Sequence, residues 1–147
     1  QTAAATGTHR INFGMDAISE LNAVRLAKLM TYVEFESFRA IPKQEFLMFR
    51  LGKTYAPSVN RFIELFNRRS KYVASVILVQ TNTEDRVGAI TKWTKVAQAC
   101  QSMSNFSTAF IIASAIFSSV VYSLSATLAQ LSRDVKIALQ KFSALMS

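Results

Sequence analysis

Few residues in this sequence have side chains suited to acid–base or nucleophilic chemistry. The only histidine is His9, near the start of the chain, so a folded core has no histidine for an acid–base pair or a metal site. The one cysteine, Cys100, lies among apolar residues at helical spacing, which favours a small buried side chain over a nucleophile. Glu34 and Glu36 are two residues apart and would point to different sides of a helix, which argues against a paired-carboxylate site.

Glycine and cysteine usage also argues against bound cofactors. The four glycines are scattered at positions 7, 14, 52 and 88, so there is no glycine-rich phosphate loop. A single cysteine cannot build an internal disulfide framework or a cysteine-rich metal site. We therefore expect no cofactor and no metal, and neither a hydrolase nor a metalloenzyme.

Composition favours an all-α fold. Of the 147 residues, 50% are hydrophobic and 18% are charged, which excludes a disordered chain. Four glycines and two prolines leave little material for the turns of an all-β fold. The basic residues behind the net charge of +8 are spread from Arg10 to Lys141, and no basic block is longer than Arg68-Arg69-Ser70-Lys71. This distribution favours a solvated positive face over a nucleic-acid site. The N-terminus lacks a signal-peptide pattern, which indicates a cytoplasmic protein.

We expect a flexible tail over residues 1–15 and a single helical domain over residues 16–147. One helix face is indicated by apolar residues at i, i+3, i+4 and i+7: Leu26, Leu29, Met30 and Val33. Pro42 ends that region, and a short helix over 44–51 would stop at Gly52.

Three further helical patterns follow. The segment 56–80 carries a stripe formed by Val59, Phe62, Ile63, Phe66, Ser70, Val73 and Ile77, with Pro57 in the first helical turn. Residues 84–102 form a second long helix, with Thr83 as the expected N-cap. Leucines and other apolar residues from Leu124 to Leu145 alternate in steps of four and three, the pattern of a helical seam.

A stretch without any charged residue or histidine runs from residue 96 to residue 132. Residues 106–124 are long enough to cross a membrane, but serines interrupt them and no cluster of Lys or Arg flanks them. We favour two buried helices of about 12 residues that meet at Ser118-Ser119, with the serine hydroxyls bonded to backbone carbonyls.

Four segments, in order, carry a family resemblance. They are LAKLMTYVEFESFRAIPKQEFL (26–47), APSVNRFIELFNRRSKYVASVIL (56–78), RVGAITKWTKVAQACQSMSNFSTAFIIASAIFSSVVYSL (86–124) and FSALMS (142–147). Together they resemble the N-terminal part of the catalytic domain of Ras-family guanine-nucleotide exchange factors, the Cdc25-homology or RasGEF domain.

The resemblance implies an all-α domain that binds a Ras, Rap or Ral type small GTPase in signal transduction. Such domains hold switch II of the GTPase and open switch I, which expels nucleotide and Mg²⁺ without covalent chemistry. Physically this is differential binding, because the domain favours the nucleotide-free GTPase and so speeds release of the nucleotide. The protein would thus be a guanine-nucleotide releasing factor and not a conventional enzyme.

Carried over position by position, the GTPase contacts of the family fall on Lys28, Thr31, Phe110, Phe117 and Tyr122. Phe110 and Phe117 are seven residues apart on one apolar face, so packing in the core remains an alternative for both. Thr31 could instead bond its own helix backbone. Tyr122 is the strongest candidate, because an amphipathic ring suits an interface.

The sequence also departs from the family pattern. Phe117 replaces the usual Asn, Val120 replaces Pro, Ser123 replaces Arg and Leu128 replaces Trp. The polar contacts expected beside Tyr122 are therefore partly lost. Without the proline, residues 124–145 could continue as one helix.

The helical hairpin that opens switch I belongs to a later part of the family domain. We therefore expect weak or no exchange activity from these residues alone, self-association through exposed apolar surface, no transmembrane span, and closeness to a membrane through the GTPase. The main alternative is a catalytically inactive helical scaffold that binds no GTPase. A membrane protein and a nucleic-acid-binding protein are the remaining alternatives, and neither is favoured.

Overall fold

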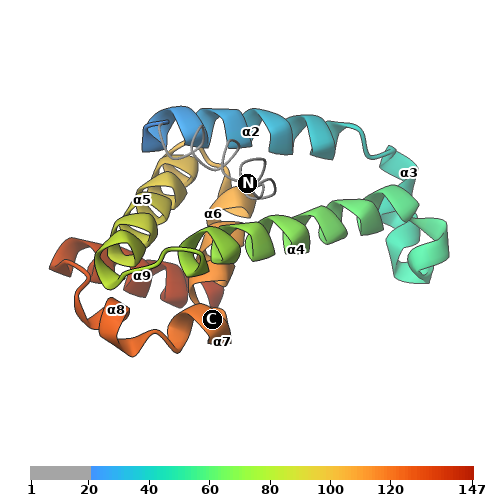
Figure 1. Ribbon diagram of the computed structural model, residues 1–147. Helices are drawn as coiled ribbons and strands as arrows, with labels where there is room; N and C mark the ends of the chain where they lie inside the picture. The colour runs from blue at the N-terminus through green and yellow to red at the C-terminus, as the bar shows by residue number, and fades with distance from the viewer. Residues whose placement is uncertain (1–20) are drawn as a thin grey trace, which may run out of the picture.

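The structure is a computed structural model that describes residues 21–147. The tail predicted over residues 1–15, His9 and the first residues of the domain predicted over 16–147 lie outside the described residues. Every regular element of the described part is helical, which confirms the all-α class (Figure 1). The elements are α2 (Ala23–Arg39), α3 (Lys43–Met48), the 3-10 helices η1 (Phe49–Leu51) and η2 (Lys53–Tyr55), α4 (Pro57–Leu78), α5 (Thr83–Ser102), α6 (Phe106–Ile116), α7 (Ser119–Tyr122), α8 (Ser125–Ala129) and α9 (Arg133–Met146).

Polar N-caps begin four of these helices. The side chains of Asn22, Asn82, Asn105 and Ser132 each accept a hydrogen bond from the backbone N–H three residues further on. The predicted cap Thr83 is wrong by one residue, because the longer Asn82 side chain accepts that bond and Thr83 is the first helical residue. Two predicted features of the neighbouring elements are confirmed: Pro57 opens α4, and Gly52 stops η1 at φ +121°, a conformation that strains residues with a Cβ.

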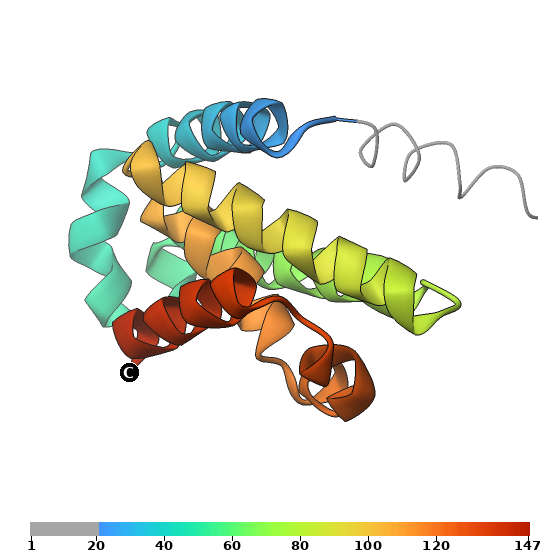
Figure 2. The ribbon, with the colours of Figure 1, turned by 90° about the vertical axis from the view of Figure 1, so that its left-hand side faces the viewer.

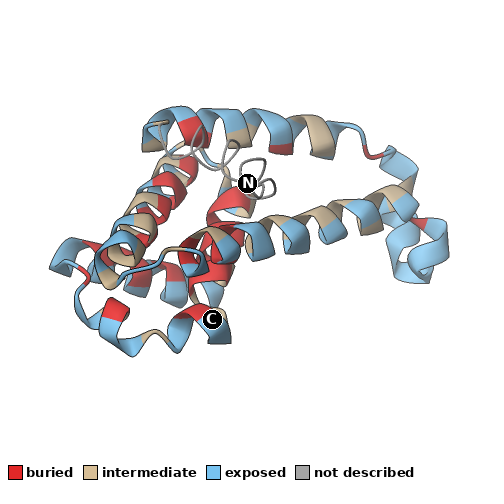
Figure 3. Ribbon diagram, in the orientation of Figure 1, coloured by how far each residue is buried: buried red, intermediate tan, exposed pale blue. Residues whose placement is uncertain are grey.

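Helix α6 lies at the centre of the bundle, between α4, α5 and α9 (Figures 1 and 2). Seven of its eleven residues are buried, among them Ile111, Ile112 and Ile116. The core around α6 includes Ile77 of α4 and Trp93 of α5. In Figure 3, buried positions gather on α5 and α6. The part of the charge-free stretch that forms α6 is therefore a buried centre, as predicted. Within residues 21–147, no helix combines the length and apolar character needed to cross a membrane.

The predicted interruption at Ser118-Ser119 is confirmed. Helix α6 ends at Ile116 and α7 begins at Ser119, while the hydroxyl of Ser118 donates to the carbonyl of Ala115 at 2.6 Å. The second of the two predicted buried helices is wrong, because the chain forms two short helices there instead, α7 and α8.

A continuous helix over residues 124–145 is also wrong. The chain breaks after α8 and restarts at α9, where Ser132 adopts an extended backbone conformation and caps the new helix. Leu131 is buried at this corner. A cap at Ser132 and the buried Leu131 therefore make the turn between α8 and α9.

The first half of α4 and the second half of α2 extend beyond the bundle, and α3, η1 and η2 join them at the tip (Figures 1 and 2). The stripe predicted on α4 is consequently buried only near its end, at Val73 and Ile77. Ile63 is 42% exposed, and Phe62 and Phe66 are half-buried. The predicted helix over 44–51 is α3 followed by η1.

Candidate functional site

The five predicted contact residues come from three helices that are not all adjacent in the chain, α2, α6 and α7. Lys28 and Thr31 lie one turn apart on α2, Phe110 lies on α6, Phe117 is the C-cap of α6, and Tyr122 ends α7. Lys28 is exposed and Tyr122 is 65% exposed, whereas the other three are half-buried. All five therefore have some surface that a partner can reach.

The outward side of α6 places Phe110 and Phe117 in one line. Ser107, Phe110, Ser114 and Phe117 are spaced at i, i+3, i+7 and i+10, and all four are half-buried, whereas residues 108, 109, 111–113, 115 and 116 are buried. Of the two alternatives, packing and partner contact, this position allows both, because each of the two side chains is only partly buried. We call these four residues the α6 stripe.

Phe117 and Tyr122 border the same groove at the end of the α6 stripe. Its volume is about 570 Å³, and it lies between α6, α7, α8 and α9. The remaining wall is formed by Ile116, Leu128, Leu131, Lys136, Leu139, Gln140 and Ser143. The Lys136 ammonium donates to the carbonyl of Ala129 at 2.8 Å, so this cation is held at the edge of the groove. The groove is suited to an apolar side chain from another protein.

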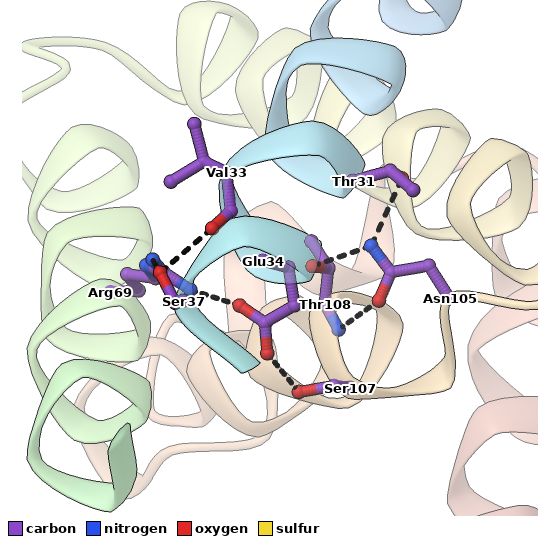
Figure 4. Close-up of polar contacts among 8 residues, drawn as sticks. All are labelled: Thr31, Val33, Glu34, Ser37, Arg69, Asn105, Ser107 and Thr108. Carbon is purple, nitrogen blue, oxygen red and sulfur yellow. Dashed lines mark hydrogen bonds and ion pairs between the residues drawn. The ribbon is translucent and has the colours of Figure 1, made fainter. Parts of the chain in front are cut away.

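Thr31 belongs to the opposite end of α6. Its hydroxyl accepts a hydrogen bond from Nδ2 of Asn105 at 3.0 Å, so its partner lies outside its own helix (Figure 4). The same amide group donates to Oγ1 of Thr108 at 2.8 Å, while Oδ1 of Asn105 caps α6 through the Thr108 N–H. Asn105 therefore fixes the start of α6 against α2. Its position just before Phe106 indicates the cap of α6 but not the bond to Thr31 of α2.

A buried carboxylate next to this contact joins three helices. Glu34 of α2 is 5% exposed; it forms an ion pair with Arg69 of α4 and accepts a hydrogen bond from Ser107 of α6 (Figure 4). The guanidinium of Arg69 also reaches the hydroxyl of Ser37 at 3.4 Å. Sequence reasoning missed this connection, because Arg69 and Ser107 are far from Glu34 along the chain.

Two predictions made from the sequence are confirmed: Glu34 and Glu36 point to different sides of α2, and Cys100 is buried. Glu36 points away from Glu34 and pairs with Arg39 at 2.8 Å on the surface. Cys100 is fully buried, with its sulfur 4.0 Å from the carbonyl of Ala27. Burial raises the pKa of the Cys100 thiol to about 11, so the thiol is neutral and unreactive at pH 7.

A second groove, of about 470 Å³, opens beside Thr31. It is lined by Glu34, Phe35, Phe38, Phe62 and residues 103–107. The two grooves lie at opposite ends of α6, whose eleven residues span about 16 Å, and the α6 stripe runs between them. The structure thus brings Phe117 and Tyr122 together and places Thr31 at the far end. A protein interface of standard size, about 800 Å² per partner, is wide enough to cover both ends.

Comparison with known proteins defines the class of protein that has this fold and surface. The RasGEF domain family matches residues 25–147, so the chain belongs to the RasGEF domain family. Ras-specific guanine nucleotide-releasing factor 2 of Danio rerio is 32% identical over 130 residues, which cover 86% of this chain and 10% of that protein. Ras guanine nucleotide exchange factor G of Dictyostelium discoideum is 33% identical over 134 residues, 88% of this chain and 9% of that protein.

A third relative is the Rap guanine nucleotide exchange factor of Caenorhabditis elegans, 36% identical over 99 residues, which cover 65% of this chain and 7% of that protein. The chain spans about a tenth of the length of the curated relatives it matches. The aligned region is thus a small part of each of these relatives.

Proposed function

We propose that this chain binds a small GTPase of the Ras, Rap or Ral type without covalent chemistry. The contact surface would consist of the α6 stripe and Tyr122, with Lys28 and Thr31 at its α2 end. The observation that carries the proposal is the position of Tyr122, which is 65% exposed and borders an apolar groove together with Phe117. The names of two relatives, a Ras-specific releasing factor and a Rap exchange factor, support this class of partner.

An exposed tyrosine beside an apolar groove has the properties of an interface hot spot. Its ring can bury a large area at a low cost in conformational entropy, and truncation of such a residue typically costs about 2 kcal/mol. We therefore expect Tyr122→Ala to weaken binding of nucleotide-free GTPase by about 30-fold, since about 1.4 kcal/mol corresponds to a factor of ten.

The test measures binding of residues 1–147 to nucleotide-free Ras and Rap by biolayer interferometry. Tyr55→Ala is the matched control, because Tyr55 is similarly exposed, at 57%, but lies at the tip formed by η2. Selective loss with Tyr122→Ala supports the proposed surface. Equal affinity of both variants and the wild-type chain would show that the GTPase binds elsewhere.

Exchange activity is a separate part of the proposal. Release of mant-GDP from Ras and Rap should be accelerated weakly or not at all by residues 1–147 alone, because the resemblance assigns the opening of switch I to a later part of the domain. Strong acceleration by this chain would refute that part. A cytoplasmic location, closeness to the membrane through the bound GTPase, and self-association through exposed apolar surface belong to the same proposal.

One observation favours the alternative of a helical scaffold that binds no GTPase. The hydroxyl of Ser123, at the position where the family pattern has Arg, donates to the carbonyl of Val120 in its own turn at 2.8 Å. This side chain therefore offers no long polar arm beside Tyr122. Failure of the wild-type chain to bind any nucleotide-free GTPase in the panel would favour the scaffold.

A further inference from the structure

The tip of the molecule, residues 43–55, exposes an unusual amount of apolar surface. It comprises α3, η1 and η2, and none of its residues is buried. Six large apolar side chains are exposed in this short segment: Phe46 (44%), Leu47 (82%), Met48 (44%), Phe49 (42%), Leu51 (69%) and Tyr55 (57%). In Figure 3 this region is almost uniformly pale blue and stands apart from the core. Clustered exposure of this kind marks an interaction surface.

The charge of the tip is positive where it faces solvent. Lys43, Arg50 and Lys53 are all exposed. The single acidic residue is Glu45, and its carboxylate is occupied at the start of α4, where it accepts hydrogen bonds from the Ser58 N–H at 2.7 Å, the Ser58 hydroxyl at 2.8 Å and the Val59 N–H at 3.2 Å. The three cations are thus not neutralised by the only carboxylate of the segment.

The tip is held in place despite its lack of buried residues. Ile41 and Ala56, which flank it, are buried at 7% and 0% exposure. Phe46 packs against Phe38 of α2 at 5.6 Å between ring centroids, and Phe38 packs against Phe62 of α4 at 6.1 Å. These contacts and the Glu45 cap fix the tip at the ends of two long helices. The apolar and basic side chains of the tip therefore face solvent from a segment that is held in position by α2 and α4.

We propose that this tip docks onto the surface of an anionic lipid bilayer. The aliphatic and aromatic side chains would enter the region between headgroups and acyl chains, and Lys43, Arg50 and Lys53 would bind the headgroups. Residues 46–49 are consecutive and all exposed, so apolar groups leave the short helix in several directions. A fluid lipid layer accommodates such an arrangement, whereas a protein groove receives one face of a helix. The inference is independent of GTPase binding.

The experiment measures co-sedimentation of the full chain with vesicles of pure phosphatidylcholine and with vesicles that also contain phosphatidylserine. One basic residue near an anionic surface contributes about fivefold to partitioning, so K43Q/R50Q/K53Q should lose on the order of a hundredfold in binding. The control K95Q/R133Q/K141Q removes the same charge at exposed positions of α5 and α9 and should lose much less.

A second variant tests insertion of the apolar side chains. L47S/L51S changes the two most exposed leucines of the tip, which contribute nothing to the core, and should also release the chain from anionic vesicles. The proposal is overturned by absence of binding, by equal loss in the tip and control charge variants, or by vesicle binding that L47S/L51S leaves intact. It is equally overturned if sedimentation shows a dimer that L47S/L51S dissociates while vesicles are not bound, because the tip then contacts a second copy.

Discussion

The ion pair between Glu34 and Arg69 leads to a sharp prediction about stability. Glu34 is 5% exposed and has two partners, Arg69 of α4 and Ser107 of α6. Arg69→Met preserves most of the aliphatic stem but removes the guanidinium, so a buried carboxylate would remain with only one hydrogen-bond donor. We expect this variant to be strongly destabilised.

The two partners differ in exposure, and this sets the size of the effect. Removing one partner of a buried ion pair costs about 3–5 kcal/mol. The side chain of Arg69 is 23% exposed, so water can reach the vacated position, and we expect a loss of about 3 kcal/mol for Arg69→Met. Glu34→Gln leaves a cation that can turn to water, at a cost of about 1–2 kcal/mol.

Urea unfolding followed by the fluorescence of Trp93 measures these losses, because this only tryptophan is 4% exposed in the core. The double variant E34Q/R69M contains no buried charge, so it should be more stable than Arg69→Met alone by about 1 kcal/mol or more, the interaction energy typical of coupled residues. The reasoning is refuted if Arg69→Met costs less than about 1 kcal/mol, or if the double variant is less stable than both single variants.

Two further predictions concern Cys100 and Glu45. Maleimide should label Cys100 at pH 8 only as fast as the chain unfolds. Because the folded state raises the pKa of the Cys100 thiol from 9.0 to about 11, the resulting stabilisation of the fold is complete below pH 9 and is lost as the pH rises towards 11. The free energy of unfolding of Cys100→Ala should therefore decline less steeply across that interval. Glu45→Gln should speed amide hydrogen exchange in residues 43–59 and lower the free energy of unfolding by about 1–2 kcal/mol, because α4 loses its charged cap. The control Glu64→Gln, at an exposed position of α4, should do neither. Unchanged exchange at the tip in Glu45→Gln would contradict the capping role.

Several features followed from the sequence because they depend on local or compositional properties. The scarcity of glycine and proline indicated the all-α class. The charge-free stretch indicated a buried helix, and α6 is that helix. The interrupting serines disfavoured a membrane span, so the protein core was the remaining place to bury its apolar residues. Pro57 and Gly52 marked helix boundaries, since each restricts or permits backbone angles at its own position.

Other features required the packing of distant segments. Periodicity marked the whole stripe on α4 as apolar, but the buried residues of α4 lie only near its end, and Ile63 stays exposed. The seam from Leu124 to Leu145 has the period of one helix, yet the cap at Ser132 and the buried side chain of Leu131 divide it. Periodicity indicates which face of a helix is apolar. It does not indicate along how much of that face a neighbouring helix packs.

The surface around Tyr122 illustrates the division most clearly. Sequence alone determined that Tyr122 follows a break after a buried helix and that the chain resembles the RasGEF family. Only the tertiary structure decided that Phe117 and Tyr122 share one groove, that Thr31 bonds Asn105 at the other end of α6, and that Glu34 is held between Arg69 and Ser107. The physical reason is that local spacing sets helix and face, whereas contacts between side chains far apart along the chain arise only when the helices pack.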